Sequence, residues 1–182
     1  MKLNLGCGLH KEEGYINIDK YQHLNPDICL DFTKDKLPFK DNSVDEVKLD
    51  AVISYIDDLT FLFKEIYRVS KDKATVKIIT PHFSYGFGDP YHKKGHSIGF
   101  INFVNLYAQT NFKVNKVEFG WLRAPSLHNI VTKTFNNMIS FFANLNKNFC
   151  ERVWCYWLGG FEKVEFELEV VKDEKSRTKN LI

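Results

Sequence analysis

Short apolar runs, separated by polar and glycine-containing turns, recur along the chain at the spacing expected for strands. These runs are separated in several places by segments of helical periodicity, an order that is typical of a mostly parallel sheet. The last run alternates strictly, with Glu165, Glu167 and Glu169 between apolar residues. That pattern is typical of an antiparallel strand with one solvated face. The segments predicted to form strands are residues 2–6, 15–19, 28–32, 44–50, 75–80, 114–120 and 164–171.

Helical periodicity appears between these strand segments. Residues 59–70 place apolar side chains on one face, after Asp57 or Asp58 as the cap. Ser97 can cap a second helix whose inward residues are Ile98, Ile101, Val104 and Ala108. Alternation of strands and helices predicts an α/β fold with a mostly parallel sheet.

Residues 121–160 form a helical insertion where a short turn would connect the last two strands. Ser126 is its expected cap. Packing against the sheet is the ordinary fate of such an apolar face, and the alternative is a lid or a dimer surface. Residues 172–182 are expected to form a polar tail. The side chains that share the face are Ile130, Val131, Phe135, Met138, Phe142, Leu145 and Phe149.

Composition narrows the class of protein. A chain of 182 residues corresponds to one domain, and a net charge of +2 argues against a strongly basic nucleic-acid binder. No apolar run is long enough to span a membrane. With no secretory signal preceding the cysteines, we expect reduced thiols and a cytoplasmic location. The cysteines, whose spacing matches no zinc motif, are Cys7, Cys29, Cys150 and Cys155.

The most informative chemistry lies in the first two strand segments. The first ends in Gly6-Cys7-Gly8 and the second ends in Asp19. Glycines let the backbone turn tightly and approach a ligand closely. An acidic side chain at the end of the next strand can accept hydrogen bonds from both ribose hydroxyls. These features predict a nucleoside-containing cofactor at the carboxyl edge of the sheet.

The length of the first connection selects among nucleoside cofactors. A dinucleotide fingerprint needs a third glycine where Lys11 stands, and a full helix facing the pyrophosphate. Only six residues separate Gly8 from Tyr15, and there is no phosphate loop. A cofactor that has a ribose and no phosphates does not need the long helix, and S-adenosyl-L-methionine is such a cofactor.

The chain also resembles a known family over residues 2–82. The matching pieces are Asn4-Leu5-Gly6-Cys7-Gly8, Gly14-Tyr15-Ile16-Asn17-Ile18-Asp19, Leu37-Pro38-Phe39, Asp41-Asn42-Ser43-Val44-Asp45, Asp58, Glu65-Ile66-Tyr67-Arg68-Val69 and Thr80-Pro81-His82. In order and spacing they are similar to the small class I S-adenosylmethionine-dependent methyltransferases, in a type 11-like branch with a shortened first helix. The resemblance implies a methyltransferase domain over residues 1–171. It also implies a Rossmann-like, three-layer αβα fold with a reversed last strand.

The resemblance implies roles for individual residues. Asp19 is expected to bind the ribose, and the glycine turn to pass close to the methionine moiety. Asp31 and Phe32 are expected at adenine, and Asp50 and Ala51 beside the methyl group. The residues expected to bind S-adenosyl-L-methionine are Asn4, Gly6, Cys7, Gly8, Asp19, Asp31, Phe32, Asp50 and Ala51.

The chain departs from the family where a base is often found. Many relatives have histidine where Ala51 stands, and Glu-His where Ser54-Tyr55 stand. The segment 81–99 offers replacements, because a loop leaving the carboxyl end of a parallel strand is a usual place for a site. Alternatives for this segment are a structural loop, or a metal site that includes His96. The candidate catalytic residues are His82, Asp89 and His92.

These features predict methyl transfer from S-adenosyl-L-methionine to a hydroxyl of a small or sugar-like acceptor. An amine or carboxylate acceptor, which needs no strong base, is one alternative. A non-catalytic module that binds the cofactor and acts through a partner is the other, and Ala51 favours it. We expect a small-molecule acceptor, no nucleic acid and a homodimer as a candidate assembly. Arg123 and His128 are candidates for binding an anionic group of the acceptor.

Overall fold

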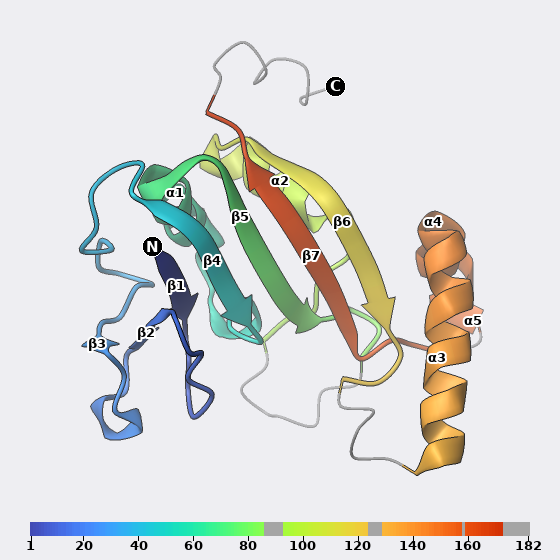
Figure 1. Ribbon diagram of the computed structural model, residues 1–182. Coiled ribbons are helices and arrows are strands. Elements are labelled where there is room, and N and C mark those ends of the chain that lie inside the picture. Colours follow the sequence, from blue (N-terminus) through green and yellow to red (C-terminus); the bar gives the residue numbers. More distant parts are fainter. Residues whose placement is uncertain (86–92, 124–128, 158, 173–182) are drawn as a thin grey trace.

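The computed structural model describes residues 1–85, 93–123, 129–157 and 159–172. Within them, a seven-stranded sheet has the order β3-β2-β1-β4-β5-β7-β6. Strand β7 runs antiparallel to both of its neighbours, β5 and β6, whereas the pairs formed by β1 to β5 are parallel (Figure 1). The strands are β1 Lys2–Leu5, β2 Ile16–Asp19, β3 Ile28–Cys29, β4 Val44–Asp50, β5 Ser70–Pro81, β6 Phe112–Gly120 and β7 Lys163–Val170. All seven predicted strands, including the reversed last one, are therefore confirmed.

The two helices expected between the strands are also present. Helix α1, Leu59–Val69, begins after Asp58, whose side chain accepts a hydrogen bond from the Thr60 backbone N–H at 2.8 Å. Helix α2, Phe100–Ala108, begins three residues later than the cap expected at Ser97. The remaining helical elements are η1 Gln22–Leu24, η2 Ile53–Tyr55, α3 Ile130–Leu145, α4 Lys147–Phe149, the π-helix η4 Cys150–Trp154 and α5 Cys155–Trp157.

Helices α1 and α2 pack against each other and cover one face of the sheet (Figure 1). Successive side chains of a strand point to opposite faces, so the apolar residues gather on the face that the helices cover. There they are fully buried. Leu3 of β1, Val47 of β4 and Val76 of β5 lie in adjacent register positions and are 0% exposed. This layer forms the hydrophobic core.

The opposite face of the sheet is polar. Lys48 of β4 pairs with Lys77 of β5, which pairs with Glu167 of β7. No helix of the described residues covers this face (Figure 1). The third layer implied by the resemblance is therefore absent from the described chain, since residues 9–14 form turns instead of a helix. The solvated face explains why polar side chains alternate with buried apolar ones even in the parallel strands.

Arg68 of α1 fixes the segment that precedes β4. Its guanidinium donates to both carboxylate oxygens of Glu65, at 2.9 and 2.8 Å. It also donates to the backbone carbonyl oxygens of Leu37 and Phe39, each at 2.9 Å. The hydrogen bonds from Arg68 lower the pKa of Glu65. Two of the sequence pieces that carry the family resemblance are thus joined in space, which anchors the chain between β3 and β4.

Candidate active site

A cavity of about 930 Å³ opens at the carboxyl edge of β1, β2 and β4. Each of the nine residues predicted to bind the cofactor lines it. Carboxyl ends of parallel strands meet at one edge, so residues far apart in the sequence come together there. The structure therefore brings the whole predicted cofactor set to a single cavity.

The glycine turn forms one wall of this cavity. Gly6 and Gly8 have φ angles of 71° and 52°, in the left-handed region where glycine is favoured. The Gly6 N–H donates to the carbonyl oxygen of Ile18 at 2.8 Å, which ties the turn to β2. A Cβ atom built on Gly6 would lie 2.5 Å from Cγ2 of Val52. Glycine is therefore required here for both backbone conformation and space.

Asp19 joins the glycine turn to the end of β2. Its Oδ2 accepts from the Gly8 N–H at 2.9 Å, and its Oδ1 accepts from the Tyr21 N–H at 3.0 Å. The carboxylate is held in one orientation and the residue is 7% exposed. Because each carboxylate oxygen has two lone pairs, both can accept a further hydrogen bond from a ligand in the cavity. This geometry suits two ribose hydroxyls.

Asp31 and Phe32 follow β3, which ends at Cys29 instead of extending to residue 32 as predicted. The Thr33 hydroxyl donates to Oδ1 of Asp31 at 2.6 Å, and this hydrogen bond lowers the pKa of Asp31. Phe32 lines the same part of the cavity and is 5% exposed. An ionised acceptor beside an aromatic ring fits the amine and the face of adenine.

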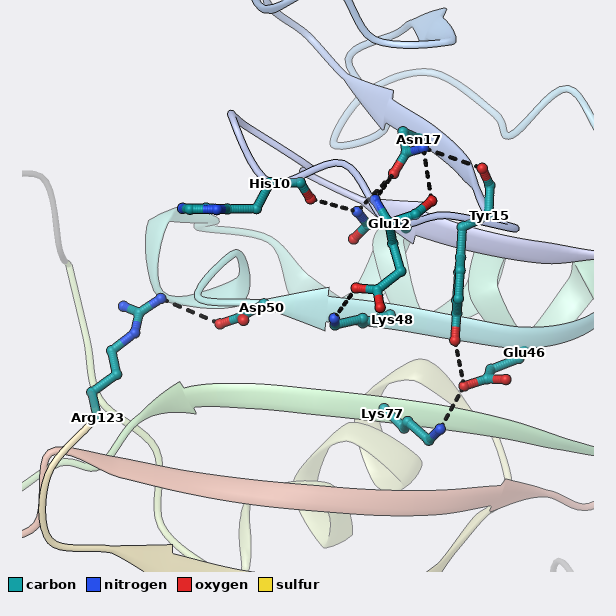
Figure 2. A network of polar contacts seen from close by, with 10 residues as sticks. His10, Glu12, Tyr15, Asn17, Glu46, Lys48, Asp50, Lys77 and Arg123 are labelled. Atoms are coloured by element: carbon teal, nitrogen blue, oxygen red, sulfur yellow. Dashed lines mark hydrogen bonds and ion pairs between the residues drawn. The ribbon is translucent and has the colours of Figure 1, made fainter. Parts of the chain in front are cut away.

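A polar network holds the loop that replaces the first helix (Figure 2). Oδ1 of Asn17 accepts from the Asn4 amide at 2.9 Å and from the Glu12 N–H at 2.8 Å. The Asn4 amide also donates to the His10 carbonyl oxygen at 3.2 Å. The Glu12 carboxylate forms an ion pair with Lys48 on the polar face of the sheet. This network fixes the backbone of His10 at the cavity wall.

The end of β4 forms the other side of the cavity. Nη2 of Arg123 lies 3.2 Å from Oδ1 of Asp50, so an ion pair connects the segment after β6 to β4. Ala51 has a φ of 55°, a conformation that costs energy for a non-glycine residue and is frequent at functional sites. Figure 2 shows the side chains of His10, Asp50 and Arg123 at the same end of the polar network. All three line the cavity.

The described histidines of the segment 81–99, which are His82 and His96, lie elsewhere. His82 is 0% exposed and does not line the cavity. Its Nδ1 lies 2.7 Å from the Ser84 hydroxyl, and its Nε2 lies 3.2 Å from Oε1 of Glu151. Burial lowers the pKa of His96 to about 4, and its Nδ1 lies 2.9 Å from the Thr80 hydroxyl. The described geometry gives His82 and His96 structural contacts.

Two of the predicted catalytic residues, Asp89 and His92, lie outside the described residues, as do Ser126 and His128. The cavity is also lined by His10, Glu12 and Lys48, which were not among the residues predicted from the sequence. The sequence held a clue to His10 and Glu12, because the connection between β1 and β2 is too short for a full helix. Its side chains must therefore lie at the cavity or in solvent.

Comparison with known proteins agrees with the fold. Residues 4–78 match a family profile described as a methyltransferase domain. No curated protein matches significantly. The matched segment runs from β1 into β5, so it contains the nine predicted cofactor residues and ends before Arg123.

Several solved structures share the fold at low identity. A SAM-dependent methyltransferase from Archaeoglobus fulgidus is 19% identical, with a TM-score of 0.62 over 92% of this chain and 85% of that chain. Phosphoethanolamine N-methyltransferase 2 from Haemonchus contortus, in complex with S-adenosyl-L-methionine, is 15% identical, with a TM-score of 0.57 over 94% of this chain and 48% of that chain. The [4+2]-cyclase SpnF is 13% identical, with a TM-score of 0.61 over 93% of this chain and 75% of that chain.

The fold and the matched domain together define the class of protein. The chain carries a methyltransferase domain in a fold that it shares with S-adenosylmethionine-dependent methyltransferases, and S-adenosyl-L-methionine is the cofactor that this domain indicates. The residues present fit this cofactor, because the cavity offers a glycine turn, an oriented carboxylate at Asp19 and an acceptor beside Phe32. Within the described residues, no helix is both long and apolar enough to cross a membrane.

Proposed function

We propose that this chain methylates a hydroxyl of a small polar acceptor, such as a saccharide. The observation that carries the proposal is that one cavity combines the predicted cofactor residues, including Asp50, with His10 and Arg123. Its volume of about 930 Å³ lies at the upper end of ordinary ligand pockets, which favours a cofactor and a small acceptor side by side.

In this proposal the nine predicted residues bind the cofactor, and Asp50, at its methyl end, also contacts the acceptor. Asp19 accepts from the ribose hydroxyls, Asp31 and Phe32 recognise adenine, and the glycine turn follows the methionine moiety. Bound S-adenosylmethionine supplies an electrophilic methyl group on a sulfonium. The chain itself has to hold the acceptor about 3 Å from that methyl group, which accounts for much of the rate of such a displacement.

We assign the proton-accepting role to His10. An alcohol must lose its proton on attack, and histidine is the side chain best suited to accept it near neutral pH. His10 lines the cavity, and the Asn4 amide and the Asn17 network hold its backbone. His82, with both ring nitrogens occupied in a buried position, is not supported in this role. Asp89 and His92 remain candidates on the acceptor side.

The Asp50–Arg123 pair suits recognition of a polyhydroxylated acceptor. A carboxylate accepts from hydroxyl groups, while a guanidinium donates to hydroxyl oxygens. The two groups lie 3.2 Å apart and are both partly exposed, so an acceptor can reach them without unfolding the site.

The test measures transfer of an isotopically labelled methyl group to a panel of saccharides. His10→Ala should lower the chemical rate by about 10²–10⁴. Cofactor affinity should stay close to that of the wild type. The rise of rate with pH through neutrality should also disappear. His23→Ala is the matched control, because His23 is exposed in η1 and does not line the cavity.

Other outcomes would assign the proton-accepting role to a different residue. If His10→Ala weakens cofactor binding and leaves the rate unchanged, His10 contacts the cofactor instead of the acceptor. A loss in His92→Ala alone would transfer the base to the segment 81–99. If His10→Ala and His92→Ala both turn over normally, the base assignment fails.

An amine or carboxylate acceptor is the alternative within the enzyme class. It is favoured by Ala51, whose methyl group offers no proton acceptor beside the reacting atoms, and by the similar Haemonchus contortus enzyme, named for N-methylation. Such substrates would be methylated by the His10→Ala variant at nearly the wild-type rate. A non-catalytic module would yield no S-adenosylhomocysteine with any acceptor.

A further inference from the structure

Helix α3 contacts the sheet through its polar side. Asn136, Ser140 and Asn144 are spaced by four residues, which aligns them along one face of the helix. They bond to backbone groups of β6 at the edge of the sheet and of the two residues that follow this strand. A sheet edge left unpaired is a site of uncontrolled association. The contacts are Asn144 with the Phe119 N–H and carbonyl oxygen, both at 2.9 Å, Ser140 with the Trp121 N–H at 3.2 Å and Asn136 with the Leu122 N–H at 3.0 Å.

Because the polar side faces β6, the apolar side of α3 points away from the sheet. Figure 1 shows α3 beyond β6, at the edge of the molecule. Five exposed apolar residues of α3, together with Phe149 of α4, follow one another at alternating intervals of four and three, which is the spacing of a coiled-coil seam. Ile130 and Phe141 are also exposed and lie beside this line. We call this set the α3 seam. Its members and exposures are Val131 at 59%, Phe135 at 49%, Met138 at 46%, Phe142 at 60%, Leu145 at 66% and Phe149 at 56%.

The α3 seam does not cover the active site. Of the described residues between 121 and 160, Arg123 alone lines the cavity. The hydrogen bonds to β6 also prevent α3 from turning its apolar side towards the sheet. The two expectations raised by the sequence, packing on the sheet and a lid, are therefore not supported by the described geometry. An exposed apolar patch of this size in a protein indicates an interaction surface.

We propose that the α3 seam is the interface of a two-fold homodimer. A seam with seven-residue spacing fits another helix, and a two-fold axis supplies an identical seam from the second copy. None of its six side chains is charged, so two copies can meet without repulsion.

The exposed area is sufficient for such a dimer. Six large side chains at about half exposure present roughly 600 Å² per copy, or about 1,200 Å² for the pair, at the lower end of specific interfaces. Tyr156 and Trp157, at 71% and 83% exposure, follow the seam in α5 and can extend the contact.

A lipid surface is the competing occupant. Interfacial membrane helices are rich in lysine and arginine on their polar side, and they add electrostatic attraction to anionic lipids. Lys133 is the only charged residue within α3, and the polar side of α3 is used for contacts with β6. The observations therefore favour a second copy of the chain.

The test is the molecular mass in solution by sedimentation equilibrium and light scattering. Wild-type protein should be a dimer at micromolar concentration. Phe142→Glu should raise the dimer dissociation constant about a thousandfold, because each copy brings an unpaired carboxylate into the contact. Phe103→Glu on α2 is the matched control, since Phe103 is 59% exposed and Phe142 is 60% exposed. That variant should remain dimeric.

Circular dichroism and cofactor titration verify that the variants are folded. If Phe142→Glu does not fold, Phe135→Glu, two helical turns away, is measured in its place. A monomeric wild type overturns the proposal. It is also overturned by a dimer that survives both seam variants. A monomer that sediments with vesicles of equal parts phosphatidylcholine and phosphatidylserine would assign the seam to membranes instead.

Discussion

Removing the Asp19 side chain tests the geometry of the cofactor half of the cavity. The carboxylate lines the cavity and accepts from the backbone N–H groups of Gly8 and Tyr21, at 2.9 and 3.0 Å. Asp19→Ala therefore removes the proposed ribose acceptor together with two backbone contacts. A hydrogen bond to a charged group is worth about 1.5–3 kcal/mol, so cofactor affinity should fall about ten- to a hundredfold.

The same substitution should also lower the free energy of unfolding, by about 1–2 kcal/mol, for the backbone groups left without their partner. Asp58→Ala is the control, because the Asp58 side chain accepts from the Thr60 N–H at 2.8 Å and does not line the cavity. It should lose about 1 kcal/mol of stability as a helix cap, with no change in affinity. Calorimetry with S-adenosylhomocysteine and urea unfolding measure both quantities. A folded Asp19→Ala variant with wild-type affinity would refute the ribose assignment.

Two further predictions concern a glycine and a buried histidine. Gly6→Ala should abolish cofactor binding and lower the melting temperature, because its Cβ would lie 2.5 Å from Val52. Gly14→Ala is the control: its Cβ would have no atom within 4 Å, so it should cost only about 1–2 kcal/mol of backbone strain. Equal losses of stability in the two variants would contradict this prediction. His96 stays neutral in the fold because burial lowers its pKa to about 4, while the unfolded chain takes up a proton below about pH 6.5. Unfolding free energy should therefore drop by about 2 kcal/mol from pH 7 to pH 5 and level off near pH 4. Urea titrations that show no such slope, or the same slope in His96→Asn, would be inconsistent with it.

The strands were predictable because each contains continuous or alternating apolar residues and most are bounded by turn residues. The reversed direction of β7 was visible in the glutamates that alternate along it. The sequence also indicated the uncovered face of the sheet, because Lys48 and Lys77 alternate with buried residues in β4 and β5. That signal was overlooked because parallel strands usually have both faces covered.

The orientation of α3 could not be predicted from periodicity. Periodicity shows that Phe135, Phe142 and Phe149 share a face, but it does not show which face meets the sheet. The usual assumption that the apolar side packs inward is wrong here, because Asn136 and Asn144 satisfy the edge of β6. Which side docks depends on unpaired backbone groups of a distant strand, and a local pattern carries no information about them.

The convergence of the predicted cofactor residues on one cavity could be predicted, because they follow strand ends and parallel strand ends meet at one edge. His82 was expected at the active site, but it does not line the cavity. It continues the buried alternation of Val76, Ile78 and Thr80 along β5, and therefore turns into the core. Extending the period-two alternation of β5 by one residue beyond its end would have placed His82 in the core.

The central claim is that the cavity at the carboxyl edge of β1, β2 and β4 binds S-adenosylmethionine. Isothermal titration calorimetry of the purified chain with S-adenosylmethionine, S-adenosylhomocysteine and NAD tests it most directly. We predict that both sulfur nucleosides bind one shared site and that NAD does not compete, because residues 9–14 form no helix to receive a pyrophosphate. Tight binding of NAD, with no heat from either sulfur nucleoside, would contradict the account.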